Sequence, residues 1–144
     1  MEKQGGELPE QEDGMDGIGR LKVKVYTSLA QIPVSGATVV VTGQGEQGKR
    51  TLLSVQTTDR SGNVKPITVI TPAAQESTHP GNGERPYTLC DVWAEHPGFA
   101  ILLVEGVQVF SGVDTFQGME LNPLSEGTSS LTTTDVREIP SQNL

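Results

Sequence analysis

Residues 20–42 read RLKVKVYTSLAQIPVSGATVVVT, and this stretch decides the fold class of the chain. Leu21, Val23 and Val25 alternate with polar neighbours, which is the period of a strand with one buried face. Turn residues that include Pro and Gly come next, and a β-branched run typical of strands occupies 37–42. The stretch therefore predicts two strands joined by a turn region.

The same signals recur along the rest of the chain. Further strands are expected, in chain order, at residues 51–57, 64–70, 87–95, 99–104, 107–110 and 115–121. Asp59 predicts a tight turn over 58–62, because its carboxylate can accept backbone N–H bonds there. Pro66 cannot donate a ladder hydrogen bond, so it places its strand at an edge or a bulge. Short strands at this spacing, with no amphipathic helix between them, predict an all-β antiparallel sandwich of seven or eight strands.

Both ends of the chain differ from this central pattern. Residues 1–19 hold six acids, one lysine and five glycines without periodicity, and they are predicted to form a disordered acidic tail. Residues 124–144 are rich in Ser and Thr and are predicted to form a second disordered tail. The sandwich domain is accordingly assigned to residues 20–123.

Charge and cysteine content argue against several classes of function. The formal net charge is −8 with no Lys/Arg-rich run, so the positive surface that nucleic acids and anionic membranes attract is not expected. The single cysteine, Cys90, excludes an intrachain disulfide and a multi-cysteine metal site, and we expect it in the core. No apolar run is long enough for a signal peptide or a membrane span, so synthesis in the cytosol is expected. No cofactor is predicted.

Several short motifs resemble a known family of sandwich domains. PVSGATV at 33–39 and TDRSG at 58–62 are similar to the carboxypeptidase-regulatory-like, or transthyretin-like, domain. RPY at 85–87 and GVQVF at 106–110 resemble the N-terminal domain of bacterial spore-cortex-lytic and peptidoglycan-binding proteins. The resemblance covers residues 20–123 and implies a transthyretin-like or immunoglobulin-like strand arrangement. It also implies a non-catalytic structural or interaction domain associated with the spore or cell envelope, because it does not extend to the lytic modules of those proteins.

A candidate interaction surface lies in and after the longest loop of the domain. Residues 71–85 are polar and rich in Pro and Gly, and loops of this length often carry binding residues. His79 and Arg85 lie in this loop, and Tyr87 follows it. Trp93 belongs to the face of its strand opposite the expected core, where an exposed Trp would anchor a partner; a covered Trp93 is the alternative. We expect these four residues to face a protein or peptidoglycan partner.

Two chemical roles are disfavoured by the pattern. His79 and His96 lack a further ligand or acid at a spacing suited to a metal or a general base. An isopeptide bond from Lys22 or Lys24 to Asn122 is disfavoured because both lysines are expected to face solvent. A structural component of a phage particle or surface appendage is the alternative to the envelope domain, and an enzyme is the third class.

Overall fold

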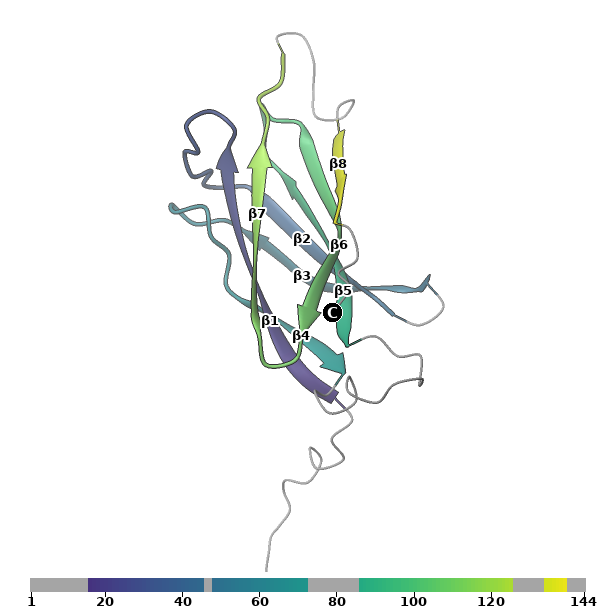
Figure 1. Ribbon diagram of the computed structural model, residues 1–144. Helices are drawn as coiled ribbons and strands as arrows, with labels where there is room; N and C mark the ends of the chain where they lie inside the picture. Colours follow the sequence, from purple (N-terminus) through teal and green to yellow (C-terminus); the bar gives the residue numbers. More distant parts are fainter. Residues whose placement is uncertain (1–15, 46–47, 73–85, 126–133, 140–144) are drawn as a thin grey trace, which may run out of the picture.

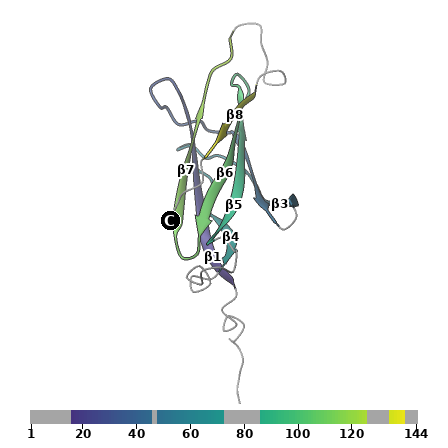
Figure 2. The ribbon, with the colours of Figure 1, turned by 45° about the vertical axis from the view of Figure 1, so that its right-hand side comes forward.

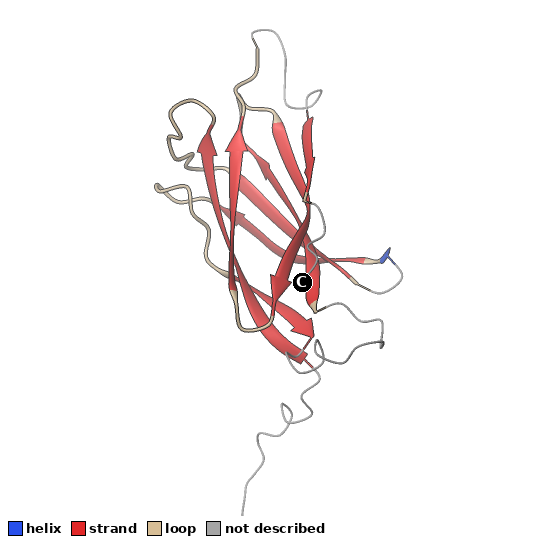
Figure 3. Cartoon of the chain, in the orientation of Figure 1, coloured by secondary structure: helices blue, strands red, loops and turns tan. Residues whose placement is uncertain are grey.

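The computed structural model describes residues 16–45, 48–72, 86–125 and 134–139 of the 144-residue chain. These residues form eight strands and no α-helix (Figure 1). In chain order the strands are β1 (Asp16–Thr27), β2 (Thr38–Gln44), β3 (Arg50–Thr57), β4 (Ile67–Pro72), β5 (Tyr87–Glu95), β6 (Ile101–Phe110), β7 (Asp114–Leu121) and β8 (Thr134–Glu138). The short blue segment in Figure 3 is a 3₁₀ position at Gly48, in the hairpin between β2 and β3.

The strands form two sheets that pack face to face. β4, β1 and β7 make a three-stranded sheet in that order, and β3, β2, β5, β6 and β8 make a five-stranded sheet. The turned view in Figure 2 shows the two layers, with β7 in one and β5 and β6 in the other. The expected all-β sandwich is confirmed.

Alternating side chains from both sheets fill the interior. Leu21, Val23 and Val25 of β1 are buried, whereas Lys22 and Lys24 between them face outward as expected. Burying one side chain of this size stabilises the fold by about 1.5–3 kcal/mol, and this gain determines which face of each strand points into the core. The other large side chains that are fully buried are Val39, Val41, Val69, Val92, Leu102, Val107, Val109, Met119 and Leu121.

The expectation of purely antiparallel pairing is wrong for two strand pairs. β1 runs parallel to β7, with Arg20 beside Asp114, and β6 runs parallel to β8, with Ile101 beside Thr134. A period of two shows which side chains face the core, but it does not show in which direction the neighbouring strand runs. β7 reaches β1 because the chain turns tightly after β6 and enters the other sheet.

Strands extend into both predicted tails, so the predicted boundaries of 20–123 are too narrow. β1 begins at Asp16, and Ile18 pairs with Ile70 of β4. β8 lies inside the Ser/Thr-rich segment that was expected to be disordered. Four of its five residues are exposed, so it carries no hydrophobic period, and its backbone pairs with β6 instead. Residues 1–15, 126–133 and 140–144 lie outside the described part of the chain.

The strand expected at 64–70 begins later than its pattern indicated. β4 starts at Ile67, directly after Pro66. Proline has no N–H to donate to a ladder, and β4 lies at an edge of the three-stranded sheet as Pro66 predicted.

β6 is one strand where two, at 99–104 and 107–110, were expected. Its register with β5 shifts between Cys90 and Val92, and the buried apolar positions of β6 change there from even to odd residue numbers. Gly106 lies at the shift with a φ of 84°, a conformation that glycine adopts without steric cost. The break in the alternation is therefore a β-bulge and not a turn.

A buried threonine joins the segment PVSGATV at 33–39 to the turn TDRSG at 58–62. The Thr58 hydroxyl donates to the Val34 carbonyl at 2.7 Å and accepts from the Ala37 amide at 2.9 Å. The adjacent turn forms as predicted, because Asp59 Oδ1 accepts the amides of Ser61 and Asn63 at 2.9 and 3.0 Å. One side chain thereby fixes the turn before β2 against the turn after β3.

Candidate functional site

An unbroken row of apolar side chains crosses the outer face of the five-stranded sheet. The pairing register places one residue of each strand beside the next, from β3 through β2, β5 and β6 to β8. We call this set the Trp93 row; its members are Val55, Val40, Trp93, Leu103 and Val136. Val55, Trp93 and Val136 are exposed, whereas Val40 and Leu103 are half-buried.

Trp93 lies at the centre of the row. Its strand neighbours Val92 and Ala94 are fully buried, so the alternation of β5 directs the indole to the outer face. The residue is 42% exposed, and its Nε1 donates to Glu95 Oε1 at 3.4 Å. Trp93 is thus an exposed aromatic side chain, as the interaction hypothesis required.

The same outer face carries three carboxylates beside the row. Glu95 follows Trp93 on β5, and Glu105 of β6 lies directly beside Glu138 of β8. In the parts of the chain that the structure describes, none of the three forms an ion pair. The row is therefore an apolar surface with a negative border.

The other predicted site residues do not join Trp93 in one described surface. Tyr87 opens β5 and packs edge-to-face on Phe110, with ring centroids 5.3 Å apart. His79 and Arg85 fall outside the described residues, as do residues 73–85 of the expected binding loop. His96 lies in the turn after β5, where its Nδ1 is 2.9 Å from the Pro97 carbonyl oxygen.

Sequence reasoning missed the buried carboxylate of Asp91. By alternation it belongs to the outer face of β5, yet it is 2% exposed. Asp91 Oδ1 accepts the amide of Gly106 at 3.1 Å, and Oδ2 forms an ion pair with Arg50. The carboxylate therefore satisfies the amide that the bulge in β6 displaces from the ladder. Asp91 therefore has a structural role, since its two carboxylate oxygens are engaged by the Gly106 amide and by Arg50.

A second surface feature, on the opposite side of the sandwich, was also missed. A groove of about 540 Å³ lies on the outer face of the three-stranded sheet. It is lined by Lys22, Lys24 and Tyr26 of β1, by Phe116 and Gly118 of β7, and by the segment that precedes β4. Phe116 is 73% exposed, and the Lys22 ammonium lies 5.2 Å from the centroid of its ring. The alternation along β1 could have predicted that Lys22, Lys24 and Tyr26 share the outer face. Only the parallel pairing with β7, which the sequence does not reveal, brings Phe116 beside them.

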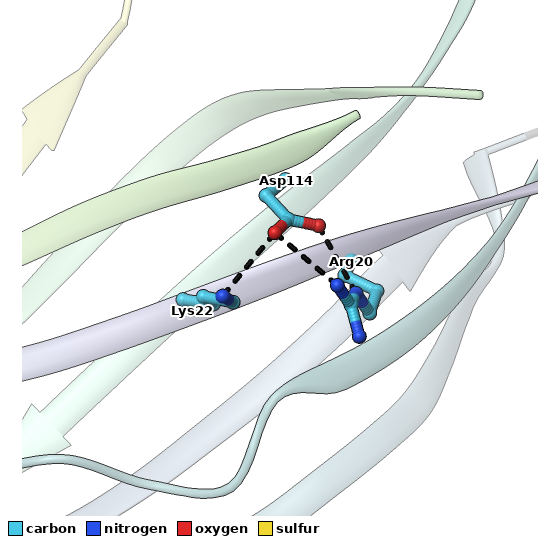
Figure 4. A network of polar contacts seen from close by, with 3 residues as sticks. All are labelled: Arg20, Lys22 and Asp114. Atoms are coloured by element: carbon cyan, nitrogen blue, oxygen red, sulfur yellow. Dashed lines mark hydrogen bonds and ion pairs between the residues drawn. The ribbon is translucent and has the colours of Figure 1, made fainter. Parts of the chain in front are cut away.

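An ion-pair network borders this groove (Figure 4). Asp114 Oδ1 accepts from Arg20 Nε at 3.0 Å, and Asp114 Oδ2 lies 3.2 Å from Lys22 Nζ. Hydrogen bonds from Arg20 and then from Lys22 hold the pKa of Asp114 below its usual range. Two cations thus share one carboxylate, which leaves a positive charge in excess.

Three further observations concern the described residues. Within the described ranges, no group of three His, Cys, Asp or Glu side chains is placed to hold a metal ion. Cys90 is fully buried, and burial raises the pKa of its thiol to about 11, so the thiol stays protonated and inert at neutral pH. No described helix has the length and apolar character that a membrane crossing demands.

Comparisons with known proteins were made at the level of sequence and of fold. No family model matches the chain, and no curated protein matches it. Among solved structures, the chain is similar to a 9R-lipoxygenase from Cyanothece PCC8801, with a TM-score of 0.39 and 11% sequence identity. That match covers 89% of this chain and 19% of the lipoxygenase chain. The class that the fold itself defines is an all-β sandwich protein.

Proposed function

We propose that this chain is a non-catalytic interaction domain of a spore or cell envelope, and that it docks a protein partner through the Trp93 row. The observation that carries the proposal is the continuity of the row, because five strands each contribute one apolar side chain. Aromatic residues surrounded by smaller apolar ones are typical of the centres of protein interfaces.

The border of the row argues for the kind of partner. Glu95, Glu105 and Glu138 would meet lysine or arginine side chains on a complementary surface, and opposite charges steer such encounters. The same carboxylates would repel the carboxylates of peptidoglycan. At this face, therefore, a protein with an apolar and basic surface is favoured over the glycan itself.

The envelope setting rests on the sequence motifs. RPY at 85–87 and GVQVF at 106–110 are the segments similar to domains of spore-cortex-lytic and peptidoglycan-binding proteins. Of these segments, GVQVF forms the second half of β6 and packs its two Val side chains into the core, so its first role is structural. The setting is accordingly the part of the proposal that the first experiment tests.

The test is co-sedimentation with spore cortex and vegetative envelope preparations, each with and without prior protease treatment. We expect the protein to pellet with the untreated preparations and protease treatment to reduce this pelleting strongly. Trp93→Ala should reduce pelleting about tenfold or more, the loss typical of an anchor residue. Ile70→Ala, which removes an exposed apolar side chain from the other sheet, should pellet like the native chain.

Trp93 is the only tryptophan of the chain, so its fluorescence reports directly on the row. Adding the untreated, protein-bearing fraction should shift the emission to the blue as the indole leaves water. Pelleting that protease treatment does not reduce, or that Trp93→Ala leaves unchanged, would refute docking of a protein through the row.

Self-association, as in a phage particle or appendage, is the alternative. Two copies that met through this face would bring like charges together, which costs binding energy. We therefore expect sedimentation-velocity profiles that do not depend on concentration. Oligomers that form with a blue shift of Trp93 emission would favour the alternative.

A further inference from the structure

We infer that the groove on the three-stranded sheet is a second binding site, and that it takes an acidic saccharide. The inference does not depend on the proposed function, because the groove and the Trp93 row lie on opposite faces of the sandwich. The volume of about 540 Å³ falls within the range of small-molecule sites.

The charge of the groove selects for an anion. Lys24 is exposed and forms no ion pair with any described residue. Lys22 shares the carboxylate of Asp114 with Arg20, so that carboxylate cannot neutralise both cations. Glu120 lies beside Tyr26 on the same face, so two carboxylates stand against three cations there. The excess positive charge, on a chain of net charge −8, is a local reversal of sign that attracts carboxylates.

The aromatic side chains of the groove suit a flat ring with apolar faces. Phe116 presents an exposed ring beside the Lys22 ammonium, so that one ligand can meet both groups. Tyr26 lies across Gly118, where a Cβ atom would approach the tyrosine hydroxyl oxygen to 3.0 Å. The absent side chain lets the phenol lie against β7 and form a wall with a hydrogen-bonding tip.

The backbone beneath the groove argues against an extended acidic peptide. Such peptides bind by adding main-chain hydrogen bonds to an unpaired strand edge. The floor of the groove is β1, and β7 pairs with it on one side. On the other side the Val25 amide donates to Gly62 at 2.8 Å, and the Val64 amide donates to the Val23 carbonyl at 3.3 Å. The β1 floor thus offers side chains without free main-chain groups, which suits a saccharide. An extended peptide would have to pair with the outer edge of β7 instead, and the tetraglutamate probe tests this.

The test is calorimetric titration of the full chain with three probes of similar length: a tetragalacturonate, cellotetraose and a tetraglutamate peptide. We expect the tetragalacturonate to bind and its affinity to fall with added salt, whereas cellotetraose binds at least about fivefold more weakly, the loss expected for one surface charge pair. The tetraglutamate should bind more weakly still, because it has no ring to stack on Phe116. Equal affinity for the tetraglutamate would overturn the assignment to a saccharide.

Matched variants separate the groove from general electrostatics. Phe116→Ala should weaken tetragalacturonate binding about tenfold, whereas Val113→Ala, at an exposed apolar site in the β6–β7 turn, should not. Lys24→Gln should weaken it about fivefold, whereas Lys49→Gln in the β2–β3 hairpin should not. Equal effects of the two lysine variants, or no binding of tetragalacturonate at millimolar concentration, would overturn the inference. Trp93→Ala should bind the probe normally, so failure of either proposal is recognised separately.

Discussion

Replacing Thr58 by valine should destabilise the sandwich far more than the loss of one hydroxyl group suggests. The side chain keeps its shape in Thr58→Val, so the core gains no cavity. The change instead removes the partner of the Ala37 amide and one partner of the Val34 carbonyl, which lie 2.9 and 2.7 Å from the hydroxyl. Both of these residues are buried, so water cannot replace the hydroxyl.

The magnitude follows from the two groups that lose a partner. A buried donor or acceptor without a partner costs about 1–3 kcal/mol, so the loss of two partners should lower the free energy of unfolding by about 2–6 kcal/mol. Thr58→Ser keeps the hydroxyl and removes one methyl group, which should cost about 1 kcal/mol. Thr57→Val, at the exposed neighbouring position, should change the free energy by less than about 0.5 kcal/mol.

Urea denaturation followed by the fluorescence of Trp93 measures all three variants, because the chain has no other tryptophan. The slope of the free energy against urea should stay constant, which shows that only stability has changed. A smaller loss for Thr58→Val than for Thr58→Ser would refute the reasoning, since the methyl group and not the hydroxyl would then matter.

Three further predictions concern the bulge, the cysteine and the last strand. Gly106→Ala and Gly98→Ala each force a side chain into positive φ, and each should lower the free energy of unfolding, measured in urea, by about 1–2 kcal/mol. Gly106→Ala should cost more, because its added Cβ would lie 3.2 Å from the Ile139 carbonyl oxygen, whereas that of Gly98 would contact nothing within 4 Å. A larger loss for Gly98→Ala would contradict the bulge geometry. The Cys90 thiol has its pKa raised from 9.0 to about 11, so above pH 9 the unfolded chain loses a proton that the folded chain keeps. The free energy of unfolding should therefore fall by about 2 kcal/mol between pH 9 and 11; Cys90→Ala should abolish this decline, and a decline that persists in that variant would have another origin. In hydrogen exchange the amides of β8 should exchange before those of β5, because β8 contacts mainly β6 and most of its side chains are exposed; equal protection would show that β8 opens only with the whole domain.

The sequence pattern predicted the strands that bury one face. It did not predict the features that depend on which strands lie side by side. The alternation of Leu21, Val23 and Val25 predicted β1 and the outward direction of its lysines. No comparable signal exists for β8, because a strand held by backbone pairing needs no apolar period. The parallel pairing of β1 with β7 and of β6 with β8 was also not predicted, because apolar and polar residues alternate in the same way in parallel and antiparallel strands.

The candidate sites divide along the same line. Trp93 could be predicted, because alternation on β5 alone places it on the outer face. The row around it could not, since it requires the register of five strands. Asp91 was missed because its burial depends on the bulge at Gly106, a feature of β6 rather than of its own strand. His79 and Arg85 stay predictions, since both lie outside the described residues.

The pairing of β1 with β7 has a consequence for how the chain is made. Arg20 lies beside Asp114, so β1 leaves the ribosome long before β7, the strand that completes its sheet. Contacts between such distant residues slow folding, and an unpaired strand edge invites association with other chains meanwhile. The apolar face of β1 is thus exposed longest during synthesis. Aggregation of nascent or truncated chains, rather than loss of the finished fold, is where defects in β7 should first be seen.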